Sequence, residues 1–124
     1  MLRAMIVITF EVTPAEGCED AYLALAARMR PLAEAMPGFV SVERFRSIAD
    51  PRKLVSVSTF ESEAAVGDWR RLPEHRAAQR AGRAGILADY RLRVSHVLRD
   101  YGPDRRGEAP EDSNAVHCPW TADA

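Results

Sequence analysis

Two histidines are the residues of this sequence best suited to move a proton at neutral pH. His96 lies in an alternating apolar row with Leu92, Val94 and Leu98, in a segment that has the period of a strand. Its ordinary pKa lies near neutrality, so it could act as a general base toward a phenol or an acidic C–H group. A hydrogen-bonded core histidine would produce the same pattern. His75 belongs to a predicted helix, where we expect it at the helix surface or at the rim of a pocket.

Other catalytic signatures are missing from the sequence. It contains no nucleophile elbow or triad order, no phosphate-binding glycine loop and no metal-ligand spacing. Cys18 and Cys118 lie far apart and are expected to be free thiols. Ser56 and Ser58 alternate with valines, which predicts two hydroxyls on one face of a sheet.

Arginine and tyrosine side chains could add polar groups to a pocket. Arg44 and Arg46 share one face of a predicted strand. A solvated edge or a dimer-interface salt bridge explains them better than binding of an anionic substrate. Tyr22 and Tyr90 could supply pocket hydroxyls, but amphipathic packing is the simpler interpretation.

Hydrophobic periodicity predicts the elements that must position these residues. Alternation with a period of two predicts strands over residues 3–12, 39–47, 54–61 and 91–101. Apolar residues at spacings of three and four predict a helix that ends at Pro37-Gly38, with Thr13 as its N-cap and Pro14 in its first turn. A second helix is predicted to begin near Ser62 and to be broken or restarted at Pro73.

The order β-α-β-β-α-β predicts an α+β, ferredoxin-like sandwich in which two helices cover one face of the sheet. The other face would still carry apolar side chains, namely Met5, Val7, Val40, Val42, Val55 and Val57 or their neighbours. Large exposed apolar patches are rare in monomers, so we expect a second copy to cover this face and complete a dimeric α+β barrel.

The chain divides into a predicted domain over residues 1–101 and a tail or arm over residues 102–124. The second segment is rich in Gly, Pro and acidic residues and shows no periodicity. Ala115-Val116 and Pro119-Trp120 could attach parts of it to a partner subunit.

Composition narrows the classes of partner. The chain of 124 residues is 47% hydrophobic and 28% charged, with a formal net charge of −1. This charge gives no reason to expect binding to nucleic acid or to an anionic membrane. The apolar run near the start lacks a cleavage site and is interrupted by Glu11, and no stretch is long enough to span a membrane. We therefore expect a cytoplasmic protein.

Several stretches resemble the antibiotic biosynthesis monooxygenase family. They are ITFEVTPAEGCEDAYLAL, PGFVSVERFRS, KLVSVSTFESEAAVGDWR and HRAAQRAGRAGILADYRLRV, which together span residues 5 to 101. The most telling is a strand that ends in Phe60-Glu61 and is followed by a helix that carries Trp69. The resemblance implies a dimeric barrel with an apolar cavity.

The same resemblance implies a cofactor-independent monooxygenase that oxidises a small aromatic or quinol-type substrate with O₂ in that cavity. Trp69 matches the helix-borne Trp that lines the family's cavity, although a Trp that packs the second helix on the sheet would look the same. The catalytic candidates are Trp69, His96 and His75, and the substrate-binding candidates are Phe10, Phe60, Gln79 and Tyr90. No metal ligand is expected.

Haem is the cofactor to consider, because one branch of the family degrades it. That branch would place an Asn and a ligand His where this sequence has Phe10 and Gln79. Gln is outside the usual repertoire of axial haem ligands, so no cofactor is expected and haem binding through His75 or His96 is disfavoured. The alternative to the oxidase is a non-catalytic dimeric barrel that binds a small apolar ligand or has a regulatory or structural role.

Overall fold

The central strand β1 (Ile6–Pro14) organises a four-stranded sheet with the strand order β2-β3-β1-β4. The structure is a computed structural model, and it describes residues 5–117. β1 pairs antiparallel with β3 (Leu54–Phe60) on one side and with β4 (Leu87–His96) on the other, and β2 (Phe39–Arg46) pairs with β3 at the edge. This is the predicted ferredoxin-like α+β arrangement.

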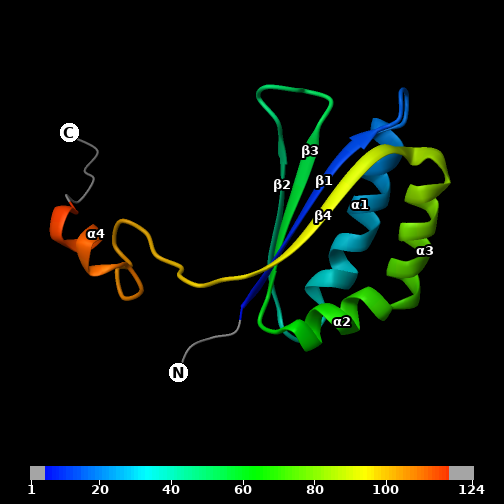
Figure 1. Ribbon diagram of the computed structural model, residues 1–124. Helices are drawn as coiled ribbons and strands as arrows, with labels where there is room; N and C mark the ends of the chain where they lie inside the picture. The colour runs from blue at the N-terminus through cyan, green and yellow to red at the C-terminus, as the bar shows by residue number, and fades with distance from the viewer. Residues whose placement is uncertain (1–4, 118–124) are drawn as a thin grey trace.

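Three helices lie on one face of the sheet (Figure 1). They are α1 (Glu19–Glu34), α2 (Glu63–Arg71) and α3 (Pro73–Ala81), and a π-helical turn, η1 (Gly82–Ile86), leads from α3 into β4. The predicted break at Pro73 is confirmed, because Pro73 begins α3 at a position where its missing N–H costs no hydrogen bond. Within residues 5–117, no helix is both long enough and apolar enough to cross a bilayer.

The core lies between this face of the sheet and the helices. One buried cluster joins Ile6 and Phe60 to Ala65 and Val66 of α2, and a second joins Val12, Tyr22 and Leu54. Because side chains alternate along a strand, the same face of β1 also presents Ile8 and Phe10, which lie between the two clusters.

The prediction that Thr13 caps the first helix is wrong. Thr13 and Pro14 extend β1, where they pair with Asp89 and Leu87 of β4, and the Ala15 N–H donates a hydrogen bond to the Ile86 carbonyl at 2.8 Å. Pairing with β4 therefore prevails over the local capping pattern, and a turn separates the strand from α1, whose N-cap is Cys18.

The fourth strand begins and ends earlier in the sequence than predicted. It was expected over residues 91–101 but spans Leu87–His96, because its ladder with β1 extends as far as Pro14. The Val97 N–H still donates to the Met5 carbonyl at 3.0 Å, and beyond that point the chain leaves the sheet.

The face of the sheet away from the helices is uncovered within residues 5–117 (Figure 1). Its strand positions include Val7, Val55, Val57 and Phe45, as the registers of β1, β3 and β2 place them. Val42 was predicted here but lies on the helix-covered face, because a register shift between Phe39 and Ser41 changes the alternation of β2.

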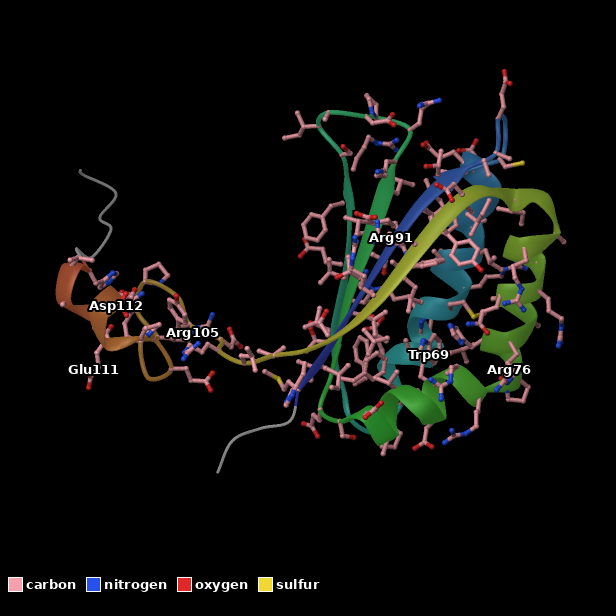
Figure 2. All side chains as sticks on the ribbon, viewed as in Figure 1. Trp69, Arg76, Arg91, Arg105, Glu111 and Asp112 are labelled. Carbon is pink, nitrogen blue, oxygen red and sulfur yellow. The ribbon has the colours of Figure 1, made fainter. Side chains whose placement is uncertain are left out.

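Beyond β4 the chain forms an arm that runs away from the sheet and ends in a short helix, α4 (Glu111–Val116) (Figure 1). Arg105, Glu111 and Asp112 lie on this arm, apart from the sheet (Figure 2). The arm is held by its own hydrogen bonds, in which Arg106 donates to Ser113 at 2.8 Å and to Asn114 at 3.0 Å. Cys118 and the predicted contact Pro119-Trp120 lie outside the described residues.

Candidate active site

A cavity of about 290 Å³ lies between the sheet and helices α1, α2 and α3. Its walls are mainly apolar and come from every strand of the sheet and from all three helices. The apolar lining includes Ile8, Phe10, Leu25, Met29, Phe39, Val42, Phe60, Val66, Trp69, Leu87, Leu92 and Val94. A cavity of this size and character suits one small, largely apolar molecule.

Six of the seven predicted site residues line this cavity. Trp69 extends from α2 into the space between the helices and the sheet (Figure 2). The other five are Phe10, Phe60, His75, Gln79 and Tyr90. The fold thus brings together residues from β1, β3, α2, α3 and β4.

His96 is the predicted site residue that the fold places elsewhere. It stands opposite Ile6 at the end of β4, is exposed, and does not line the cavity. The described chain therefore does not bury His96 as a core histidine, because β4 is an edge strand of the sheet. Leu98, the last member of the predicted row, is 77% exposed.

Trp69 and His75 form a close ring contact across the break between α2 and α3. Their ring centroids are 4.4 Å apart with an interplanar angle of 37°. Pro73 starts α3 in a new direction, which brings the third residue of α3 back against the ring of Trp69. The contact fixes both rings at the cavity wall.

The environment of His75 favours its neutral form. Its Nδ1 atom is buried and makes no hydrogen bond within the described chain. Burial lowers the pKa of His75 from its ordinary value of 6.5, the Arg70 backbone partly opposes this change, and the charge of Arg76 adds to it. At neutral pH the ring is therefore an uncharged imidazole that can accept a proton.

The wall formed by β4 is the open side of the cavity. Tyr90, Leu92 and Val94 all line it and are each about half exposed, at 50%, 50% and 51%. The Tyr90 ring lies 5.9 Å from that of Phe10 across the β1–β4 pair. A ligand can therefore reach the interior along this edge of the sheet.

A polar corner lies at the opposite side, where β2 and β3 pair under α1. The predicted common face of Ser56 and Ser58 is confirmed, and both hydroxyl residues line the cavity. Arg44 lies opposite Ser56, and its Nε donates a hydrogen bond to the Tyr22 hydroxyl at 3.3 Å. The guanidinium also lies over the Tyr22 ring, 5.4 Å from its centroid.

The arginines of the cavity are the site residues that the sequence did not reveal. Arg44 was expected at a solvated edge or an interface, and Arg30, Arg70 and Arg83, which also line the cavity, were not singled out. Strand alternation places Arg44 and Arg46 on one face but does not say which face the helices cover. Arg46 pairs within the chain, at 2.8 Å from Glu19.

The site offers acid–base chemistry in an apolar enclosure. A neutral imidazole and several hydroxyls border a space in which aromatic side chains can hold a flat ligand. Within residues 5–117, no group of three or more His, Cys, Asp or Glu is placed to hold a metal ion.

Comparison with known proteins identifies relatives of this chain. The antibiotic biosynthesis monooxygenase model matches residues 5–81. A jasmonate monooxygenase from Pyricularia oryzae is 36% identical over 93 residues, which cover 75% of this chain and 43% of the fungal protein. The chain thus spans less than half the length of that relative.

Solved structures share the fold at low sequence identity. Rv0793 from Mycobacterium tuberculosis superposes with a TM-score of 0.72 at 20% identity, covering 80% of this chain and 100% of that one. A variant of SnoaB from Streptomyces nogalater, a cofactor-independent oxygenase, superposes with a TM-score of 0.69 at 15% identity, covering 78% of this chain and 96% of that one. At these identities the likeness concerns the fold alone.

Proposed function

The chain belongs to the antibiotic biosynthesis monooxygenase family, and we propose that it oxidises a small aromatic or quinol-type substrate with O₂ in the cavity between the sheet and the helices. The observation that carries this proposal is the Trp69–His75 ring pair at the wall of an apolar cavity. The jasmonate monooxygenase that is similar in sequence supports it, and the fold is one that a cofactor-independent oxygenase also has.

In the proposed reaction the substrate itself supplies the electrons. A neutral His75 accepts a proton from a phenol or an activated C–H group, and the electron-rich anion reduces O₂ in the apolar enclosure. For an anthrone-type substrate, the methylene group loses two hydrogens and gains one oxygen atom, and the second oxygen atom leaves with those hydrogens as water. The four electrons that reduce O₂ all come from the substrate.

Each predicted site residue that lines the cavity has a proposed part in this reaction. Trp69, Phe10 and Phe60 hold the flat substrate by ring contacts, and Gln79 and Tyr90 offer hydrogen bonds to its oxygens. We propose that no cofactor takes part, because Phe10 and Gln79 stand where haem-degrading members would have Asn and His. The free thiol of Cys18 fits the reducing cytoplasm in which we place the protein.

We further propose that the protein acts as a homodimer. The uncovered sheet face carries Val7, Val55, Val57 and Phe45, and the arm exposes Val116 at 82% without packing on the sheet of its own chain. A second copy would cover both, which accounts for apolar surface that a monomer would leave in water.

Oxygen consumption tests the proposal. Purified protein free of haem and flavin is assayed with a panel of hydroquinones and anthrones, and wild type is compared with Trp69→Phe and His75→Phe. We expect consumption above the uncatalysed rate, with a loss of about tenfold or more in His75→Phe, in the range of a lost general base. His96→Gln is the control and should retain the wild-type rate, because His96 lies outside the cavity.

Two results would contradict the proposal. Aromatic ligands that bind in the cavity without any oxygen consumption would favour the non-catalytic ligand-binding barrel. Haem binding would contradict the cofactor-independent form of the reaction. It would appear as a shifted Soret band and a stoichiometric end point when haem is titrated into the protein.

A further inference from the structure

The charged side chains that line the cavity all have the same sign. They are Arg30, Arg44, Arg70 and Arg83, and no Asp or Glu is among the lining residues of the described chain. An apolar enclosure bordered only by cations raises the local concentration of anionic ligands relative to neutral ones. The arginine that binds such a ligand must reach it without already being paired to an acidic side chain of this protein.

Arg44 is the arginine whose charge is least compensated. Arg30 forms an ion pair with Glu34 at 3.2 Å, and Arg70 and Arg83 are exposed to solvent. Arg44 is half-buried, forms no salt bridge among residues 5–117, and donates its Nε hydrogen bond to a neutral hydroxyl, that of Tyr22. Its neighbour on the same strand face, Arg46, is by contrast held by Glu19 through two hydrogen bonds of 2.8 and 3.2 Å.

The sheet registers define a row across the cavity floor that is polar at one end. Arg44 lies opposite Ser56, Ser56 opposite Phe10, and Phe10 opposite Leu92. With strands about 4.8 Å apart, the row is about 14 Å long. A ligand lying along it would meet a guanidinium and a hydroxyl at one end and apolar side chains over the rest of its length.

We propose that the cavity takes an amphipathic carboxylate, with the carboxylate bound by Arg44 and the apolar body lying over Phe10 toward Trp69. The planar guanidinium matches a carboxylate through two parallel hydrogen bonds, and the Ser56 hydroxyl can donate a third. Tyr22 positions the guanidinium, since its hydroxyl and its ring both contact it. This assignment rests on the proposed function, because it takes this cavity to be the substrate site.

The assignment is tested by the binding of two matched ligands, neither of which has a quinol group that could be oxidised. Isothermal titration calorimetry compares 2-naphthoate with 2-naphthamide, which share the ring system and differ in charge. Wild type should bind the carboxylate about tenfold more tightly or better, as expected for a charge-assisted hydrogen-bond pair. Arg44→Gln should abolish this preference while its affinity for the amide stays within about twofold, and Arg44→Lys should keep part of the preference.

Arg46→Gln is the matched control. It removes one arginine from the same face of the same strand and should leave the preference for the carboxylate as in wild type, because Arg46 does not line the cavity. Retained affinity for 2-naphthamide shows that Arg44→Gln keeps a folded cavity, and if that variant does not fold, Arg44→Lys carries the comparison.

Equal binding of the two ligands by wild type would overturn the proposal, as would an unchanged carboxylate preference in Arg44→Gln. Because both measurements report binding without turnover, they are separate from the oxygen assay. A protein that prefers the carboxylate but consumes no oxygen would support this inference and contradict the oxidase.

Discussion

At the scale of single residues, the cavity depends on a partly buried histidine whose Nδ1 atom lacks a hydrogen-bond partner. The Nδ1 atom of His75 is unpaired within the described chain, although buried polar atoms nearly always find a partner. Leaving such a group unpaired costs stability, so a purpose other than stability would explain it. In the proposed mechanism that purpose is to accept a proton from the substrate. His75 contacts Trp69 and lies at the cavity wall, where it can do so.

The partial burial of His75 predicts how stability depends on pH. The unfolded chain protonates this imidazole near its ordinary pKa of 6.5, whereas the folded chain has a lower pKa there. Below about pH 6.5 the unfolded state therefore binds the proton more readily, and the free energy of unfolding falls as the pH decreases. His75→Phe keeps a ring against Trp69 but cannot titrate, so from about pH 7.5 to about pH 5.5 it should lose less stability than wild type.

Urea denaturation at the two pH values measures this difference. His96→Gln is the control, and because His96 is exposed we expect it to follow wild type. If wild type and His75→Phe lost the same free energy of unfolding between the two pH values, His75 would not be protected from protonation in the folded state.

Residue types and spacing located the aromatic part of the site but not its charges. Trp69, His75 and Gln79 could be placed at a cavity from the second helix and its resemblance to the family. Arg44 could not, because the alternation of β2 fixes which residues share a face and leaves open which face the helices cover. The register shift between Phe39 and Ser41 that turns Val42 and Arg44 toward α1 has no signature in the sequence.

At the scale of elements, the failure of the Thr13 prediction shows how strand pairing competes with capping. A threonine followed by proline, with a glutamate three residues after the threonine, is a good local start for a helix. Here the same residues pair with β4 instead. Without them, the backbone groups of residues 87–89 would have no strand partner. The second helix begins near Ser62 as predicted, and Ser62, which has no such competing strand partner, caps α2 by accepting a hydrogen bond from the Ala65 N–H at 3.1 Å.

The turn from α1 to β2 depends on a glycine for two separate reasons. Gly38 has a φ of +85°, and a Cβ at this position would lie 2.7 Å from the Cβ of Ala65 in α2. Gly17 has a similar φ of +78° but no atom within 4 Å of an added Cβ. We therefore expect Gly17→Ala to cost about 1–2 kcal/mol for the left-handed backbone alone.

Gly38→Ala should cost about 1–3 kcal/mol more than Gly17→Ala, because the added Cβ would also push Ala65 of α2 away from this turn. Chemical denaturation of the two variants gives both values. Equal losses would mean that α2 can shift freely at Ala65, and the close packing of this helix against the turn would then be contradicted.

At the scale of the whole molecule, the helices and the arm leave one face of the sheet uncovered by residues 5–117. Order of elements and apolar alternation were sufficient to predict this, because the two helical segments of a β-α-β-β-α-β unit cover the same face of its sheet. The helix in the arm was not predicted, since six residues rich in polar side chains give no periodic signal. The helix is short and exposes Val116, as expected of a segment that packs against the surface of another molecule.

A charge placed on the uncovered face should therefore separate the proposed dimer. Val57 lies at the centre of this face, on β3 between Thr9 of β1 and Glu43 of β2. Lysine there would have to be desolvated in a sheet-to-sheet contact, so Val57→Lys should sediment as a monomer at concentrations at which wild type is a dimer. Ile48→Lys is the matched control, because Ile48 is fully exposed in the β2–β3 turn and its change should leave the dimer intact. A wild-type protein that sediments as a monomer at micromolar concentration, or a Val57→Lys variant that remains dimeric, would contradict packing through this face.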